Sequence, residues 1–157
     1  MKAAVVGERG VEVRDVPQPA PAPSEVLIRV RASSLNRADL IVASGQPHGK
    51  MFGTGSWMGL ECAGEVEAVG SEVADLKAGD RVMASAPGGF AEYVATDWGR
   101  VHRIPANNMT YEQATCFPVA LQTMHNAVMT AGRLKRGETL LMQGASSGVG
   151  LMGMQIG

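Results

Sequence analysis

The chain has few of the features that several classes of protein need. It has 157 residues, of which only 4% are aromatic, and its 14 Lys and Arg nearly balance its 15 Asp and Glu, for a net charge of −1. The basic residues are scattered, so the sequence lacks the clustered positive charge that binds nucleic-acid phosphates. No run of about 18 apolar residues is present to cross a bilayer. We therefore expect neither nucleic acid nor a membrane as a partner.

Cysteine is also scarce. Cys62 and Cys116 lie far apart without Cys-x-x-Cys spacing, which predicts buried free thiols rather than a disulfide framework or a structural zinc site. The apolar run at 3–6 is interrupted by Glu8 and Arg9, so it is too short for a secretory signal and is interpreted as a first strand. We expect a cytoplasmic protein.

The first hundred residues have the pattern of a β domain. Apolar and polar residues alternate over 26–33 and over 62–69, the period of two that is typical of half-buried strands. Turn signals separate the shorter runs, at 17–23, 70–71, 77–80 and 87–89. Two further short strands are predicted at 81–83 and 90–94. Many short strands with such turns indicate a barrel or a sandwich.

The pattern becomes helical after Pro105. Thr110 and Gln113 form a capping box, in which each side chain satisfies an exposed backbone donor at the start of a helix. Pro118 ends that helix or begins the next one, whose apolar spacing continues to a C-terminal cap at Gly132. Residues 138–142 are short, apolar and bounded by glycines, and are predicted to form a strand.

The predicted strand leads into a turn of small residues, Gly-Ala-Ser-Ser-Gly-Val-Gly at 144–150. A helix beginning near Gly148 would direct backbone N–H groups and its positive dipole end toward a phosphate. In the dinucleotide pattern G-x-G-x-x-G, however, Ala145 and Ser147 replace the first two glycines, and only Gly150 matches. A plain tight turn therefore remains an alternative.

The same turn matches G-x-S-x-G, which would make Ser146 an acyl-transfer nucleophile. No Asp, Glu or His follows it in the chain, although that arrangement needs an acid and then a histidine after the serine. A P-loop is excluded because no Gly-Lys-Ser or Gly-Lys-Thr is present. Both alternatives to dinucleotide binding are therefore weak.

Five segments together resemble one family. The segments are Asn-Arg-Ala-Asp-Leu at 36–40, Gly-Leu-Glu-Cys-Ala-Gly-Glu-Val at 59–66, Lys-Ala-Gly-Asp-Arg-Val at 77–82, Gly-Gly-Phe-Ala-Glu-Tyr-Val at 88–94, and the turn at 144–150. In order and spacing they resemble the zinc-independent quinone oxidoreductase (zeta-crystallin-like) branch of the medium-chain dehydrogenase/reductases. The resemblance implies a mainly β GroES-like barrel domain with C-terminal helices at 1–118, followed at 119–157 by a linking helix and the start of an α/β Rossmann domain that binds NADP.

The resemblance also implies the chemistry. The positions of the zinc ligands in related alcohol dehydrogenases are similar to Asn36, Leu60 and Val119, so no metal is expected. That leaves direct hydride transfer from NADPH to a small quinone or α,β-unsaturated carbonyl. By resemblance, Asn36 is the catalytic residue and a cofactor contact, with Thr123 beside the nicotinamide. The pyrophosphate would lie over Ala145, Ser146, Ser147, Gly148, Val149 and Gly150.

Each of these residues also has a structural interpretation. Asn36 suits the N-terminal cap of a short helix, and Thr123 suits a buried hydroxyl bonded to a preceding carbonyl. Asp39 and Glu61 would form a catalytic acid pair or serve structure alone. Many relatives carry Tyr where this chain has Ile41, so a polar contact is missing. His48, in a glycine-rich loop predicted at 46–58, is a candidate for substrate contact.

The last residues favour a fragment. A mononucleotide-binding unit needs strand, helix and strand, with the ribose-reading residue about 20 positions beyond the glycine turn, whereas only seven residues follow Gly150. We therefore expect the N-terminal part of an enzyme about twice as long, a homodimer when complete, and an isolated chain that is inactive. The alternative is a non-catalytic GroES-like folding or interaction module that binds no cofactor.

Overall fold

The computed structural model describes residues 1–8, 10–46, 55–105 and 109–157. These residues form two compact units, unit 1 at Met1–Cys116 and unit 2 at Phe117–Gly157. His48 and most of the predicted loop at 46–58 lie outside the described residues.

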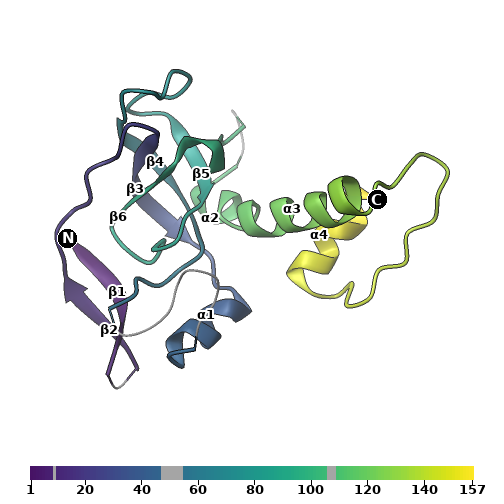
Figure 1. Ribbon diagram of the computed structural model, residues 1–157, viewed down its shortest axis with the longest axis horizontal. Coiled ribbons are helices and arrows are strands. Elements are labelled where there is room, and N and C mark those ends of the chain that lie inside the picture. The colour runs from purple at the N-terminus through teal and green to yellow at the C-terminus, as the bar shows by residue number, and fades with distance from the viewer. Residues whose placement is uncertain (9, 47–54, 106–108) are drawn as a thin grey trace. The chain divides into compact units, whose positions relative to one another are not determined.

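The main element of unit 1 is a curled antiparallel sheet of five strands (Figure 1). Its strands are β3 (Glu25–Ser33), β4 (Glu61–Val69), β5 (Arg81–Ser85), β6 (Tyr93–Asp97) and β7 (Val101–Arg103), in the order β6-β3-β4-β5-β7. The predicted strands at 26–33, 62–69 and 81–83 are confirmed. The strand predicted at 90–94 begins only at Tyr93, because the residues before it bond to a different sheet, at Ala4 and Lys2.

The core of unit 1 is built from small and β-branched side chains. It contains Val26, Ile28, Cys62, Val66, Val82, Ala84, Ala86, Val94 and Val101. Register shifts after Leu27 and Val30 bend β3 along β4. The two strands approach so closely that a Cβ on Gly64 would lie 2.0 Å from the carbonyl oxygen of Arg29. Only glycine fits there.

A second sheet in unit 1 pairs β1 (Lys2–Gly7) with β2 (Gly10–Asp15) in an antiparallel hairpin. The opposite edge of β1 forms isolated bridges with Ala91 and Trp57. Ala3, Val5 and Ala91 are buried together, with the half-buried Trp57 packed against them. The first strand predicted from the sequence is therefore confirmed.

Short helices complete unit 1. They are α1 (Arg37–Ala43), the 3-10 turn η1 (Trp98–Arg100) and α2 (Tyr111–Ala114). The capping box predicted for Thr110 and Gln113 is present at the start of α2. Cys116, predicted to be buried, is exposed, because it follows the end of α2 and not a strand of the core. Its Sγ lies 3.4 Å from the carbonyl oxygen of Glu112.

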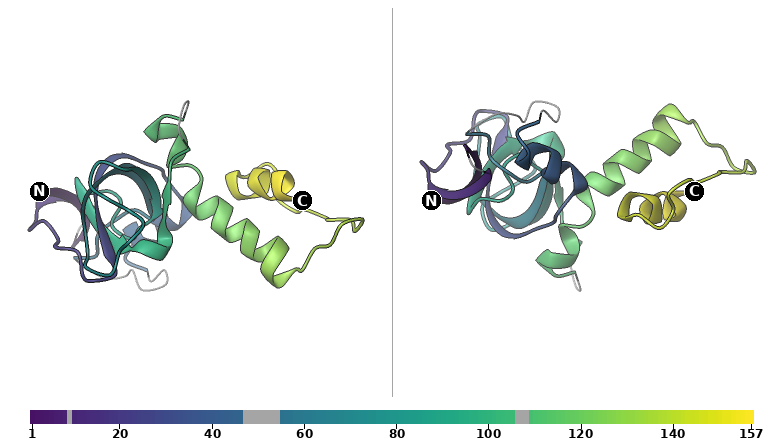
Figure 2. Two further views of the ribbon diagram at one scale, coloured as in Figure 1. Left: turned by 90° about the horizontal axis from the view of Figure 1, so that it is seen from above. Right: turned by 90° about the horizontal axis from the view of Figure 1, so that it is seen from below.

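Unit 2 is helical, with α3 (Pro118–His125), the π-helical η2 (Asn126–Ala131) and α4 (Gly148–Ile156). Pro118 begins α3, the second of the two predicted alternatives, and Gly132 ends η2 as predicted. Figure 2 shows α4 beside α3. A Cβ on Gly153 would lie 2.5 Å from the methyl groups of both Met124 and Met142, so this glycine permits close packing of the two helices.

The strand predicted at 138–142 is absent. These residues have no regular secondary structure, and Leu141 remains 84% exposed. A strand exists through hydrogen bonds to a neighbour, and no described segment of unit 2 lies alongside to provide them. The glycine turn and the helix beginning at Gly148 nevertheless form as predicted.

Candidate cofactor and substrate site

Asn36 occupies the N-terminal cap of α1 in unit 1. Its backbone N–H donates to Asp39 Oδ2 at 2.7 Å, and the backbone N–H of Asp39 donates to the carbonyl oxygen of Asn36 at 2.9 Å. Asn36 is thus the helix cap that one interpretation of the sequence predicted. Its side chain is half-buried and is directed elsewhere, toward β4.

The side-chain amide of Asn36 is held by Glu61, the first residue of β4. Asn36 Nδ2 donates to Glu61 Oε1 at 2.8 Å, and the hydroxyl of Ser34 donates to the same oxygen. Glu61 is only 3% exposed. Because Glu61 Oε1 is an acceptor in both contacts, it fixes which end of the Asn36 amide faces it. Asn36 therefore contacts both Asp39 and Glu61, a link between the two acids that the sequence did not reveal.

Large apolar side chains flank Asn36 on the surface of unit 1. Leu35 is 85% exposed, Leu40 is 72% exposed and Ile41 is 38% exposed. Exposed apolar side chains beside a fixed polar group make this a candidate interaction surface. Ile41 thus adds a third apolar side chain to this surface.

Cys62, next to Glu61, is not a nucleophile. It is fully buried in the sheet, and burial, with a smaller contribution from the Glu61 charge, raises the pKa of its thiol to about 12. The thiolate is the reactive form of cysteine. Cys62 therefore serves the core and plays no part in chemistry.

The glycine turn of unit 2 is closed by Ser147, the N-terminal cap of α4. Its hydroxyl donates to the carbonyl oxygen of Gly144 at 2.8 Å and accepts the backbone N–H of Gly150 at 3.0 Å. Gly144 has a φ of +69°, a conformation that favours glycine. The sequence correctly predicted the turn but not that Ser147 would stabilise it.

Gly148 and Gly150 have different reasons to be glycine. A Cβ on Gly150 would lie 2.3 Å from the carbonyl oxygen of Gly144, so the close approach of helix and turn requires glycine there. A Cβ on Gly148 would meet no described atom within 4 Å. Packing in unit 2 therefore does not explain Gly148, whose bare backbone lies at an exposed helix start.

The remaining predicted residues are in unit 2. Ser146 and Ser147 are exposed, and Ala145 and Val149 are half-buried around the turn. Thr123 lies on α3 and is exposed, so the alternative interpretation of Thr123 as a buried hydroxyl is wrong. Asn36 lies in unit 1 and these residues in unit 2.

No three His, Cys, Asp or Glu side chains gather into a possible metal site in the part of the chain that the structure describes. Leu60 and Val119, at two positions that resemble those of zinc ligands, have no side-chain atom that binds a metal. The described residues also include no helix with the length and apolar character needed to cross a membrane.

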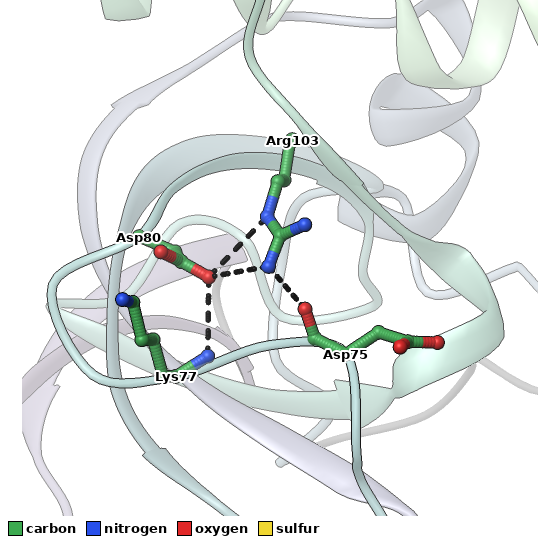
Figure 3. A network of polar contacts seen from close by, with 4 residues as sticks. All are labelled: Asp75, Lys77, Asp80 and Arg103. Atoms are coloured by element: carbon green, nitrogen blue, oxygen red, sulfur yellow. Dashed lines mark hydrogen bonds and ion pairs between the residues drawn. The ribbon is translucent and has the colours of Figure 1, made fainter.

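One of the five segments, at 77–82, is structural. Asp80 Oδ2 accepts the backbone N–H of Lys77 at 3.1 Å and the Arg103 guanidinium Nη2 at 3.1 Å, while Arg103 also donates to the carbonyl oxygen of Asp75 (Figure 3). The bond from Lys77 and then the Arg103 guanidinium hold the pKa of Asp80 below its usual value. This network ties the turn before β5 to β7 at the far edge of the sheet.

Comparison with known proteins identifies a matching domain family and similar proteins. Residues 22–106 match the sequence profile of the alcohol dehydrogenase GroES-like domain. The chain is 35% identical over 144 residues to the quinone oxidoreductase of Lama guanicoe, covering 90% of this chain and 43% of that protein. It is 36% identical over 137 residues to the highly reducing polyketide synthase cm3B of Cordyceps militaris, covering 87% of this chain and 5% of the synthase.

Among solved structures, mycobacterial Rv1454c complexed with NADPH matches with a TM-score of 0.84 and 32% identity, over 99% of this chain and 49% of that one. The curled sheet, short helices and matched profile define a GroES-like domain of the alcohol dehydrogenase type. The chain belongs to the quinone oxidoreductase branch of the medium-chain dehydrogenase/reductase superfamily. It spans about half the length of the single-function relatives that it matches.

Proposed function

We propose that this chain is the substrate domain and the beginning of the cofactor domain of an NADPH-dependent oxidoreductase. The enzyme transfers a hydride to a quinone or an α,β-unsaturated carbonyl without zinc. The observation that carries the proposal is Gly148, a glycine that packing in unit 2 does not require, at the start of a helix in a turn closed by Ser147. The names of the relatives, a quinone oxidoreductase and an NADPH complex, support the same reaction.

The turn has the properties that a pyrophosphate needs. The first backbone N–H groups of a helix have no intrahelical acceptor, and the helix dipole favours an anion near them. Ser147 Oγ accepts the N–H of Gly150, which leaves the donors at Gly148 and Val149 as those we assign to phosphate. When bound, the nicotinamide cofactor supplies the hydride, and the protein supplies orientation and excludes water.

Asn36 is assigned to the reacting ends of cofactor and substrate. Glu61 holds one side of its amide, so the remaining polar atoms of Asn36 are fixed in direction before a ligand arrives. Such preorganisation reduces the entropy lost on binding. The exposed Leu35 and Leu40 beside it suit the carbon skeleton of a quinone or enone.

The proposal that the enzyme works without zinc rests on the residues at the three positions that resemble zinc-ligand positions, which are Asn36, Leu60 and Val119. Leu60 and Val119 cannot bind a metal, and Asn36 is engaged by Glu61. Elemental analysis of the purified chain should find less than about 0.1 zinc per protein, because a stable zinc site needs at least three protein ligands. Stoichiometric zinc would contradict this assignment.

Cofactor binding is tested directly by titrating NADPH into the 15N-labelled chain and following backbone amide shifts by NMR. We expect millimolar binding, because the chain spans about half of the relatives, with the largest shifts at Gly148 and Val149. Gly148→Val should abolish these shifts, because its side chain covers the helix start, and should leave the fold intact, because the added Cβ meets no described atom within 4 Å.

The matched control is Leu141→Ser, which changes an exposed residue of the same unit and should leave the titration unchanged. Shifts spread evenly over the chain, or none at 5 mM NADPH, would contradict the proposed site and favour the non-catalytic module. Equal shifts in Gly148→Val would do the same. The cytoplasmic location and the inactivity of the isolated chain stay predictions.

A further inference from the structure

The outer edge of β2 has backbone groups with no partner in the described chain. β2 pairs with β1 on one side only, and no described strand lies along its other side. Its two valines are also exposed, Val11 at 48% and Val13 at 70%. An edge of this kind is a template for pairing with another strand.

The register of the hairpin identifies the groups on this edge. Met1 and Val16 exchange both of their backbone hydrogen bonds, at 2.8 and 2.9 Å. In an antiparallel pair such reciprocal bonds recur at every second residue, so Glu12 and Arg14 bond to β1. The N–H and C=O groups of Val11, Val13 and Asp15 therefore point outward.

The residues of β1 follow the same alternation. The backbone groups of Ala4 and Val6 point away from β2 and bond to the segments at 55–58 and 90. The edge of β1 that faces away from β2 is therefore already hydrogen-bonded. A further strand can add to the hairpin only at the outer edge of β2, at Val11, Val13 and Asp15.

The sequence of β2 complements itself in the antiparallel direction. If two copies pair about Val13, Val13 lies opposite Val13 of the other copy, and Val11 lies opposite Asp15. These are the residues whose backbone groups point outward, so they form the hydrogen-bonded pairs. Glu12 then lies opposite Arg14 at the non-hydrogen-bonded positions, where facing side chains are closest.

We propose that the outer edge of β2 is an interface with a second copy of this chain, formed by antiparallel pairing of the two β2 strands about Val13. The interface has twofold symmetry, because Glu12 of each copy faces Arg14 of the other. Within one chain Arg14 Nη2 already contacts Glu12 Oε2 at 2.8 Å, so pairing joins two ion pairs into one network of four charges. Opposite charges on facing positions stabilise a sheet, and like charges destabilise it.

The alternation of Glu12 and Arg14 along β2 indicates which strand pairs with it. A strand of unrelated sequence has no reason to present Arg opposite Glu12 and Glu opposite Arg14, whereas a second β2 does so by symmetry. This interface uses residues of unit 1 only, and it does not depend on the proposed reaction.

The test is sedimentation velocity of the 157-residue chain from about 10 μM to 1 mM, in low salt. We expect a concentration-dependent dimer that Arg14→Glu weakens at least tenfold, because Glu12 of each copy then faces a carboxylate of the other instead of a guanidinium. The double variant Glu12→Arg with Arg14→Glu should restore the wild-type dissociation constant, because the swap recreates the same pairs. A swap that fails to restore it would overturn the proposal.

A backbone variant separates edge pairing from other contacts. Val13→Pro removes an N–H that points outward and leaves the bonds to β1, a position where proline is tolerated, so it should abolish the dimer. Val13→Thr keeps the N–H and should retain the dimer. Intact folding is checked by amide protection of Glu12 and Arg14, which bond to β1.

Hydrogen exchange gives an independent readout. Protection of the amides of Val11, Val13 and Asp15 should rise with concentration in the wild-type chain and stay low in Val13→Pro. A chain that is monomeric at 1 mM, or a dimer that Val13→Pro and Arg14→Glu leave unchanged, would overturn the proposal.

Discussion

The two cysteines of the chain have opposite surroundings. Cys62 is fully buried with its thiol pKa raised to about 12, whereas Cys116 is exposed. At pH 8 a group with such a pKa is about 0.01% thiolate, and only the thiolate is alkylated at a useful rate. Iodoacetamide should therefore modify one thiol per native chain, at Cys116, and both thiols in urea.

Intact mass and peptide mapping measure this outcome. Cys116→Ser is the matched control and should leave the native chain unmodified. Rapid modification of Cys62 in that variant would mean that the β4 core opens far more readily than its burial indicates.

Gly148 and Gly150 differ in what the fold requires of them. Gly150→Ala places a Cβ against the backbone of Gly144 and Ala145, and overpacking of this kind costs about 1–3 kcal/mol. Gly148→Ala meets no described atom and should change the stability of unit 2 by less than about 0.5 kcal/mol. Urea unfolding followed by far-UV circular dichroism compares the two. Equal destabilisation would mean that Gly148 has packing contacts of its own.

Glu61 should matter more for its acceptor oxygen than for its size. Glu61→Ala leaves the half-buried side-chain amide of Asn36 without its acceptor, at a cost of about 1–3 kcal/mol, whereas the hydroxyl of Ser34 can still donate to the carbonyl oxygen of Thr115 at 3.0 Å. Glu61→Gln retains one acceptor oxygen and should cost less than half as much. The side-chain amide hydrogens of Asn36 should exchange with solvent more slowly in the wild type than in Glu61→Ala, as followed by 15N NMR. Equal exchange rates in the two proteins would contradict the contact.

At the scale of elements, the ionised side chain of Asp80 stabilises the turn at 77–80 and its contact with β7. The bond from Lys77 and the Arg103 guanidinium lower the folded-state pKa of Asp80, so its ionised form stabilises the fold. This contribution is complete above the unfolded pKa of about 4 and is lost as the pH falls through the lower folded value. Glu65 behaves likewise, because Arg31 and Tyr111 lower its pKa.

We therefore expect the free energy of unfolding of unit 1 to fall between pH 5 and pH 3, and to fall less steeply in Asp80→Asn. The effect is small, because Arg103 is exposed and Glu65 is only half-buried, so solvent screens both ion pairs. Urea titrations at several pH values measure it.

Local patterns predicted most elements, and the misses have a common physical cause. Alternation located β3 and β4, and the capping box located α2, because these signals lie within the element itself. Residues 138–142 and 90–92 were predicted as strand but depend on which neighbour provides hydrogen bonds, which a single segment does not specify. β2 and β7 were not predicted at all, since both are short and largely exposed.

The sequence predicted the local parts of the candidate site but not its contacts between distant residues. The small residues at 144–150 indicated the turn, but the contact of Asn36 with Glu61 joins residues 25 positions apart and leaves no signal in sequence spacing. Likewise, nothing in the spacing distinguishes the exposed Thr123 from a buried one. The family was recognised because five segments occur in order, and the match over 22–106 confirms it.

At the scale of the whole molecule, the chain combines a β unit and a helical unit with different needs. Unit 1 buries a core of its own, whereas unit 2 leaves Leu121, Leu141, Leu151 and Met154 exposed. Apolar surface of this extent lowers the stability of a small unit. We expect unit 2 to unfold at lower urea concentration than unit 1.

The few aromatic residues make this difference visible by spectroscopy. Both tryptophans, Trp57 and Trp98, and both tyrosines lie in unit 1, and unit 2 has only Phe117. Tryptophan fluorescence should therefore show one transition, that of the sheet, while far-UV circular dichroism also reports the earlier loss of α3 and α4. The tryptophans report on unit 1 alone. Fluorescence and circular dichroism unfolding curves that coincide would therefore show that the two units unfold together.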